Sequence, residues 1–163
     1  MPNDKPEGRT PSKSWSATAL RAALAITKSW GLTDTQAATL LGAPGAETLE
    51  AWKREAAGGQ VTLPKATVET LGLLIGSYRT LSTLFRSDAE ILDWLATPHF
   101  GSSFQGRPPM MLLTDGGSDG LWRLRIHVDA WATSTGAVGT GGGPPGEADI
   151  RYRPLADSRP AVQ

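Results

Sequence analysis

The sequence predicts an all-α protein. Apolar residues recur at helical spacing in three stretches, residues 15–30, 46–56 and 64–85. Residues typical of helix ends, such as Thr33, Gly42 and Ser87, lie between or beside these stretches. Residues 121–131 alternate in polarity as a strand does, but the chain has no second strand of comparable quality to pair with them. We therefore expect helices throughout the folded part.

Three short helices are expected in the first half. Each helical run ends at a glycine: residues 15–30 before Gly31, residues 36–41 before Gly42, and residues 46–56 before Gly58. Thr33 is placed to cap the second run. In the third run, Leu49 and Trp52 are three residues apart and would share its inner face.

The second half is expected to begin with the longest helix. Pro64 suits the first turn of a helix, and residues 64–85 carry a broad apolar stripe. Ser87 and Glu90 have the spacing of a capping box, which predicts a further helix over residues 91–96. An apolar turn at residues 110–113 and a glycine-rich break at residues 115–120 then follow.

Residues 121–131 fit two interpretations. Taken alone, the alternation of apolar with charged residues is that of a half-buried strand. The same residues also place Leu121, Leu124, Val128 and Trp131 on one face of a helix. We predict a helix, because a strand here would have no partner.

Both ends of the chain have the composition of disordered segments. Residues 1–14 are rich in Pro, Lys and Ser, and residues 134–163 are rich in Gly and Pro, so neither can bury much apolar surface. We expect a disordered arm over residues 1–14 and a flexible tail over residues 134–163. Between them we expect two helical modules, residues 15–63 and 64–133.

Composition excludes several classes of function. Sixteen Lys and Arg balance sixteen Asp and Glu among 163 residues, so no overall charge attracts nucleic acid. The absence of cysteine excludes thiolate nucleophiles, zinc–thiolate sites and disulfides, and it favours the cytoplasm. The N-terminus shows no apolar leader, and no segment is long enough to span a bilayer. We expect a cytoplasmic protein that does not enter a membrane.

No catalytic arrangement is evident. His99 and His127 have no carboxylates at ligand spacing, and His99, which follows a helix end, is expected to cap carbonyls or face water. Ser102 and Ser103 lack the third group of a hydrolase triad. The glycines of residues 139–146 have no Lys-Ser/Thr after them, as a phosphate loop requires. We expect no enzyme, no cofactor and no metal site.

Residues 33–54 have the outline of a helix-turn-helix, with a capped helix, a glycine-containing turn and a second helix. If the second helix enters DNA, Thr48 would lie near base edges and Lys53 and Arg54 would reach phosphates, with Gln36 a further candidate contact. Glu47 and Glu50 would oppose a polyanion. The alternative is a helical scaffold without DNA chemistry, and the sequence leaves both open.

A cluster of large apolar side chains surrounds residues 98–106. It exceeds the needs of a small helical module, and its Trp, Phe and Met residues are types enriched in interface cores. Its members include Trp94, Phe100, Phe104, Pro108, Met110 and Trp122. We expect some of them to close the core and others to meet a partner protein.

The order of these parts resembles a known family. Trp94-Leu95 is followed by Pro98, and Gly106 and Pro109 are followed by Leu112-Leu113. This "WL-x-x-P…G-x-x-P-x-x-L-L" pattern resembles the toxin-binding domain of the Xre/MbcA/ParS antitoxins. The spacing from Leu40-Leu41-Gly42 to Thr48-Leu49 and Trp52 is similar to their Xre-type N-terminal module.

The resemblance implies an antitoxin that binds a RES-domain toxin, an NAD-degrading enzyme, and blocks its active site. It also implies a homodimer or a higher hetero-oligomer with the toxin, and a helix-turn-helix that could repress the operon by binding operator DNA. Toxin contacts are expected at Trp94, Phe100, Phe104, Arg107, Pro108, Met110, Trp122, Arg123, Arg151, Tyr152 and Arg153.

Two other functions stay open. One is a stand-alone helix-turn-helix transcription regulator whose C-terminal part dimerises or binds a small ligand. The other is an adaptor protein with neither activity.

Overall fold

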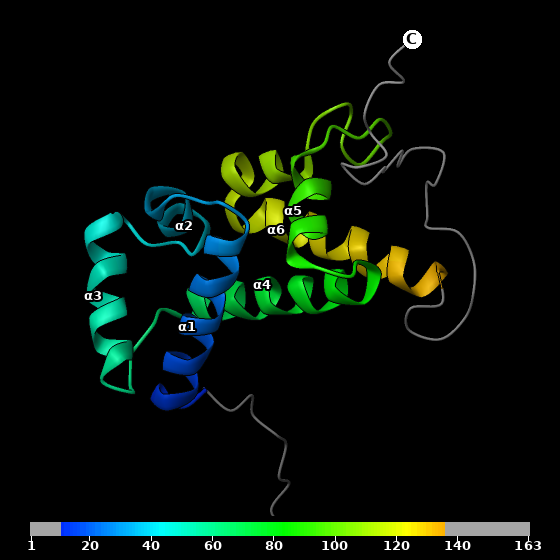
Figure 1. The fold of residues 1–163 in the computed structure, drawn as a ribbon. Coiled ribbons are helices and arrows are strands. Elements are labelled where there is room, and N and C mark those ends of the chain that lie inside the picture. The colour runs from blue at the N-terminus through cyan, green and yellow to red at the C-terminus, as the bar shows by residue number, and fades with distance from the viewer. Residues whose placement is uncertain (1–10, 136–163) are drawn as a thin grey trace, which may run out of the picture.

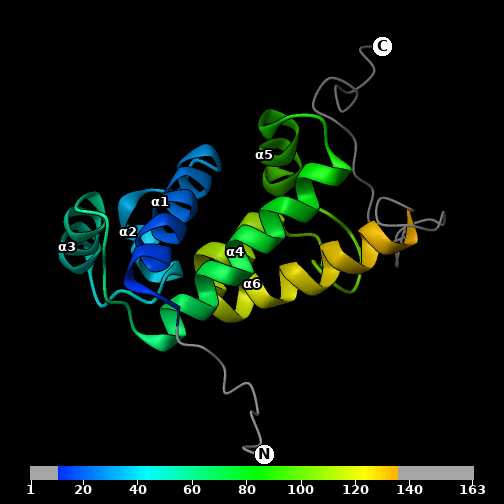
Figure 2. The same cartoon turned by 90° about the horizontal axis from the view of Figure 1, so that it is seen from below.

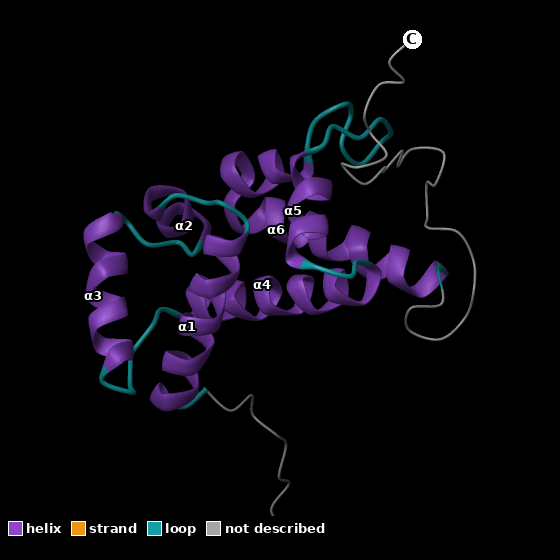
Figure 3. Ribbon diagram, in the orientation of Figure 1, coloured by secondary structure: helices purple, strands orange, loops and turns teal. Residues whose placement is uncertain are grey.

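The computed structural model describes residues 11–135, which form six α-helices (Figures 1 and 3). In chain order the helices are α1 (Lys13–Ser29), α2 (Asp34–Leu40), α3 (Ala46–Ala57), α4 (Lys65–Leu84), α5 (Asp88–Ala96) and α6 (Pro109–Ser134). Within this part of the chain the extended backbone pairs only at the isolated bridge between His99 and Arg107. The predicted all-α class is confirmed for these residues.

The two longest helices, α4 and α6, lie side by side (Figures 1 and 2). α1 packs against α3 and α4, α2 packs against α3 and α6, and α5 contacts both long helices. All six helices contribute to one apolar core, and its members include Leu20, Leu40, Leu49, Leu74, Ile91 and Leu124. The predicted boundary between residues 63 and 64 falls in the connection between α3 and α4, and helices on both sides of it share this core.

α1 begins earlier than the sequence predicts. The hydroxyl of Ser12 caps the helix by accepting a hydrogen bond from the Trp15 N–H at 3.1 Å. Trp15 is the first apolar residue of the helical stripe, whereas the cap lies three residues before it. The expected disordered arm is therefore wrong for residues 11–14, and the expected tail is wrong at Ser134, which still belongs to α6. The rest of the arm and tail, residues 1–10 and 136–163, lies outside the described residues.

The start of α2 is closed by a complete capping box. Thr33 Oγ1 accepts a hydrogen bond from the Gln36 N–H, and Gln36 Oε1 accepts one from the Thr33 N–H. The helix is only seven residues long, and helices of this length are marginal without support at their ends. The capping box therefore contributes to holding α2 against α3 and α6.

We expect Thr33→Ala to lower the free energy of unfolding by about 1 kcal/mol, because it removes the N-cap acceptor. Thr35→Ala is the matched control, since Thr35 is an exposed residue of the same helix. Urea unfolding followed by circular dichroism measures both. Equal stability of the two variants would contradict a stabilising role for the cap.

Ser87 caps α5 as predicted, with its hydroxyl accepting a hydrogen bond from the Glu90 N–H. The Glu90 carboxylate accepts a hydrogen bond from the Arg86 N–H. In the standard capping box it would accept one from the N–H of Ser87, the next residue. The Ser87 cap thus begins α5 shortly after α4 ends.

α6 has a sharp kink at the predicted glycine break. Gly117 has φ 54° and ψ −135°, a conformation that a residue with a Cβ adopts only under strain. The following part of the helix buries Leu121, Leu124, Val128 and Ala132, which recur at helical spacing. The predicted helix over residues 121–131 is confirmed, and the strand interpretation is wrong.

Candidate protein-binding surface

The connection between α5 and α6 is a folded loop. His99 and Arg107 form an antiparallel bridge, and the Gly106 N–H donates a hydrogen bond to the His99 carbonyl at 2.8 Å. Gly106 has φ 80°, and the ring of Phe100 lies so close to it that an added Cβ would sit 3.3 Å from a ring carbon. The loop thereby presents Phe100 to solvent, with 68% of its surface exposed.

Trp94 lies beneath this loop and is fully buried. Its ring contacts His99 of the loop at a centroid distance of 5.2 Å, Phe104 of the loop at 5.8 Å, and His127 of α6 at 6.4 Å. Phe104 is itself only 4% exposed. Trp94 thus joins α5, the loop and α6, and it determines where the loop sits.

The two histidines take different hydrogen bonds within this cluster. His99 is fully buried, and its Nε2 lies 3.0 Å from the carbonyl oxygen of Trp94, so Nε2 carries the proton. The expectation that His99 caps a helix-end carbonyl is confirmed, and the alternative that it faces water is wrong. His127 Nδ1 lies 3.2 Å from the hydroxyl of Ser103.

Burial makes both imidazoles poor bases. It lowers the pKa of His99, against the opposing effects of the hydrogen bond to Trp94 and of the nearby Asp93 carboxylate. Burial, with a smaller effect of His99, lowers the pKa of His127 to about 4. Among the described residues, Nε2 of His127 meets no acceptor that would orient the ring. The contact between Ser103 and His127 therefore lacks the third group that activates a serine nucleophile.

These lowered pKa values predict that the fold loses stability in mild acid. Unfolded histidines bind protons near pH 6.5, whereas folded His127 resists protonation down to about pH 4, so the free energy of unfolding falls as the pH falls through this range. We expect His127 to account for a loss of about 2 kcal/mol, allowing for screening of its partly exposed ring. Urea unfolding at pH 7.5 and pH 4.5 measures the loss. In His127→Gln the share due to His127 should disappear while that due to His99 remains, and an unchanged pH dependence would contradict the assignment.

Large apolar side chains on α6 and the loop remain exposed. Trp122 is 54% and Ile126 is 48% exposed, and their spacing of four residues makes them neighbours on one face of α6. Met111 in the first part of α6 is 37% exposed. Trp122 and Ile126 lie on the side of α6 away from the buried Leu121, Leu124, Val128 and Ala132, so they do not belong to the core.

Two arginines lie beside these apolar side chains. Arg107 of the loop and Arg123 of α6 line a pocket of about 280 Å³, together with Met111 and Asp115. Neither arginine forms an ion pair within residues 11–135. Arg123 also lies three residues before Ile126, so the pocket continues onto the exposed face of α6. We call this region the loop–α6 surface, and it consists of Phe100, Arg107, Met111, Trp122, Arg123 and Ile126.

The predicted toxin contacts divide between this surface and the core. Phe100, Arg107, Trp122 and Arg123 are exposed members of the surface. Pro108 and Met110 are partly buried, and Pro108 lines the pocket. Trp94 and Phe104 are buried and support the loop from beneath, and Phe104 also lines the pocket. The remaining three, Arg151, Tyr152 and Arg153, lie outside the described residues.

Sequence reasoning missed one member of the surface, Ile126, which lies one helical turn after Trp122. Met111 belongs to the apolar cluster that the sequence predicts around residues 98–106, but it was not among the predicted toxin contacts. Ile126 could have been found by drawing residues 121–131 as a helix and noting which apolar residues fall opposite the buried stripe.

The candidate DNA-binding residues do not form a basic face. Gln36 uses its side-chain oxygen in the capping box, and Thr48 is partly buried. Lys53 pairs with Glu50 at 2.7 Å and with Asp34 at 3.3 Å. The hydrogen bond to Glu50 is the main cause that raises the pKa of Lys53, and burial partly opposes it.

Arg54 is exposed and forms no ion pair within the described part of the chain. α3 carries three glutamates against Lys53 and Arg54. A phosphate backbone would therefore meet a helix of net negative charge, which weakens binding to any polyanion.

The described residues hold no cluster of three His, Asp or Glu side chains that could bind a metal ion. Among residues 11–135, no helix combines the length and the hydropathy needed to cross a membrane.

These features define an all-helical protein with an exposed apolar and basic surface. No protein-family model matches the chain. The "Uncharacterized protein y4oB" of Sinorhizobium fredii (strain NBRC 101917 / NGR234) is 32% identical over 111 residues, which cover 68% of this chain and 81% of y4oB. The chain belongs to the same family as y4oB.

Proposed function

We propose that the protein acts by binding another protein through the loop–α6 surface. The observation that carries the proposal is the exposure of Phe100, Met111, Trp122 and Ile126 next to two arginines without ion pairs. Exposed apolar patches of this kind mark interaction sites, and Trp, Met and Arg are the residue types enriched there. A protein partner would bury the apolar groups and supply carboxylates to Arg107 and Arg123.

The partner we propose is a RES-domain toxin, with this chain as its antitoxin. The resemblance to the Xre/MbcA/ParS antitoxins supports this choice, because residues that carry it lie in the elements that support the surface. Trp94 and Leu95 are buried beneath the loop, Gly106 has the positive φ that the loop needs, and Pro109 begins α6. The antitoxin would cover the toxin's NAD cleft, so that NAD and antitoxin exclude each other.

Operator binding through α2 and α3 is a second proposed activity of the antitoxin. The order of α2, a five-residue connection and α3 supports it. The net negative charge of α3 argues against tight binding to DNA. We therefore rank a stand-alone transcription regulator below an antitoxin as the function of this protein.

Trp122→Glu should abolish tight binding to the toxin. We expect the Kd to rise by at least ~30-fold, since a central tryptophan of an interface contributes about 2 kcal/mol or more. The assay is inhibition by this chain of NAD breakdown by the cognate RES-domain toxin that the proposal requires. Trp15→Glu is the matched control, because Trp15 is similarly exposed at 45% but lies on α1.

The proposal fails if the unmodified chain in molar excess leaves NAD breakdown unchanged. The position of the surface is wrong if Trp122→Glu inhibits as well as the unmodified chain, or if Trp15→Glu loses inhibition to the same extent.

A further inference from the structure

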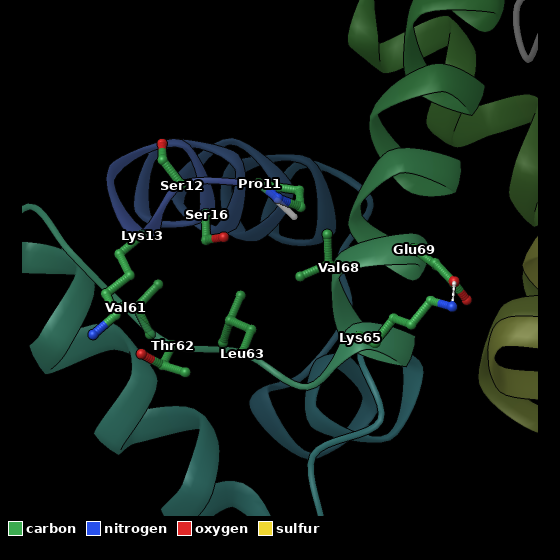
Figure 4. Close-up of a pocket in the computed structure, with 10 residues that line it drawn as sticks. All are labelled: Pro11, Ser12, Lys13, Ser16, Val61, Thr62, Leu63, Lys65, Val68 and Glu69. Atoms are coloured by element: carbon green, nitrogen blue, oxygen red, sulfur yellow. Dashed lines mark ion pairs between the residues drawn. The ribbon is translucent and has the colours of Figure 1, made fainter. Parts of the chain in front are cut away.

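We propose that a second site, the pocket between the starts of α1 and α4, binds a small amphipathic carboxylate. The pocket has a volume of about 660 Å³ and is lined by the first turn of α1, residues 61–63 and the first turn of α4 (Figure 4). This volume lies in the range of small-molecule sites, which are typically apolar with a few polar groups. None of its lining residues belongs to the loop–α6 surface, so the site is independent of the proposed toxin contact.

Aliphatic side chains form the body of the pocket. Val61, Leu63 and Val68 point toward its centre (Figure 4). The Val61 N–H donates a hydrogen bond to the Lys13 carbonyl, which holds the 61–63 segment against α1. The ligand must therefore have an apolar portion that replaces water on these side chains.

One polar group inside the pocket lacks a partner. Ser16 is only 4% exposed, and its hydroxyl points toward the pocket (Figure 4). Within residues 11–135 this hydroxyl makes no hydrogen bond, although serines in helices commonly bond to the preceding turn. Because this hydroxyl is not among the fully buried atoms without a partner, it opens onto the pocket, where it can donate a hydrogen bond to an acceptor that a ligand brings.

The charges at the rim favour an anion. Lys13 forms no ion pair with any described residue, whereas Lys65 pairs with Glu69 at 3.7 Å. α4 begins after Pro64 without a side-chain cap, so its first-turn N–H groups lack an acceptor from a cap. A helix start carries partial positive charge and adds to that of Lys13. A carboxylate could thus meet Lys13, Ser16 or the start of α4 while its apolar portion fills the pocket.

The chain's own N-terminal segment is a poor occupant by composition. Residues 1–10 read MPNDKPEGRT, in which Met1 is the only large apolar side chain. A carboxylate with an aliphatic chain matches the aliphatic walls better. Such a ligand would contact α1 and α4 together and would stabilise their packing by binding only the folded state.

Octanoate is the probe for this site, and octanol of equal chain length is its neutral control. The full chain, labelled in its methyl groups, is titrated with each and followed by NMR. We expect octanoate to shift the methyl signals of Val61 and Val68 and to bind roughly tenfold more tightly than octanol, because a charge-assisted hydrogen bond is lost with octanol.

Two variants test the polar contacts. Lys13→Gln should weaken octanoate binding by roughly tenfold, and Ser16→Ala should weaken it several-fold. Lys28→Gln is the matched control, because Lys28 is an exposed lysine at the other end of α1. It should bind octanoate as the unmodified chain does.

Four results would overturn the proposal. One is an absence of shifts at Val61 and Val68 with octanoate. The second is equal affinity for octanoate and octanol, and the third is equal weakening by Lys13→Gln and Lys28→Gln. The fourth is a nuclear Overhauser contact from the Met1 methyl to Val61 or Val68 in the ligand-free chain, which would show that residues 1–10 occupy the pocket. None of these results depends on toxin inhibition, so the two proposals can fail separately.

Discussion

Replacing Trp94 with alanine is expected to lower the free energy of unfolding by about 4 kcal/mol. Trp94 is fully buried, and besides the histidines and Phe104 it contacts Phe85 of the α4–α5 turn and Trp131 of α6. Its removal would leave a cavity between α5, the loop and α6 that these neighbours could fill only in part. Urea unfolding, monitored by circular dichroism, measures the change.

The matched control is Trp15→Ala, which removes a tryptophan that is 45% exposed. We expect it to cost less than about 1 kcal/mol, as surface substitutions usually do. Trp94→Phe should lie between the two, because it keeps an aromatic ring and removes an indole N–H that has no hydrogen-bond partner among the described residues. A loss below 2 kcal/mol for Trp94→Ala would show that Trp94 does not hold the loop in place.

The helices of this fold could be predicted because their determinants are local. Thr33 and Ser87 cap the helices they were expected to cap, and Gly31 and Gly42 have positive φ directly after α1 and α2. The early start of α1 was missed because Ser12 lies outside the apolar stripe by which the helix was recognised.

The sequence of residues 121–131 fits both a strand and a helix because apolar residues lie on the buried side and on the solvent side of this part of α6. Leu124 and Val128 face the core, whereas Trp122 and Ile126 are apolar residues on the solvent side of the same helix. The two sets together produce the alternation of a strand. Apolar residues on the solvent side break the pattern of an ordinary amphipathic helix, and local rules fail at such positions. In the proposed function these residues belong to the binding surface.

The composition of the candidate site could be predicted, but the direction of each side chain could not. Trp94 and Trp122 are both tryptophans near the loop, yet one is fully buried and the other is 54% exposed. This difference arises from the packing of α5 onto α6, which places Trp94 against His127 and Trp131, more than thirty positions later in the chain. The contact of His127 with Ser103 depends on the same packing and has no sequence pattern.

Gly120→Ala is expected to lower the free energy of unfolding by about 3 kcal/mol, because the kink in α6 leaves no space for a side chain there. A Cβ at Gly120 would lie 1.7 Å from the carbonyl oxygen of Leu112, which belongs to the backbone and cannot rotate away as a flexible side chain can. The two parts of α6 would have to separate, and this would move Met111 relative to Arg123. We therefore expect weaker toxin inhibition as well as lower stability.

Gly116→Ala is the matched control for this position. Gly116 lies four residues earlier in the same helix, and an added Cβ would meet no atom within 4 Å. Alanine there should stabilise the helix by roughly 0.5–1 kcal/mol, since it restricts the unfolded chain more than glycine does. If Gly120→Ala were as stable as Gly116→Ala, the close approach of Gly120 to Leu112 would be wrong. The pocket that joins Arg107, Met111 and Arg123 would then lose its structural basis, because the kink is what brings the first part of α6 beside the second.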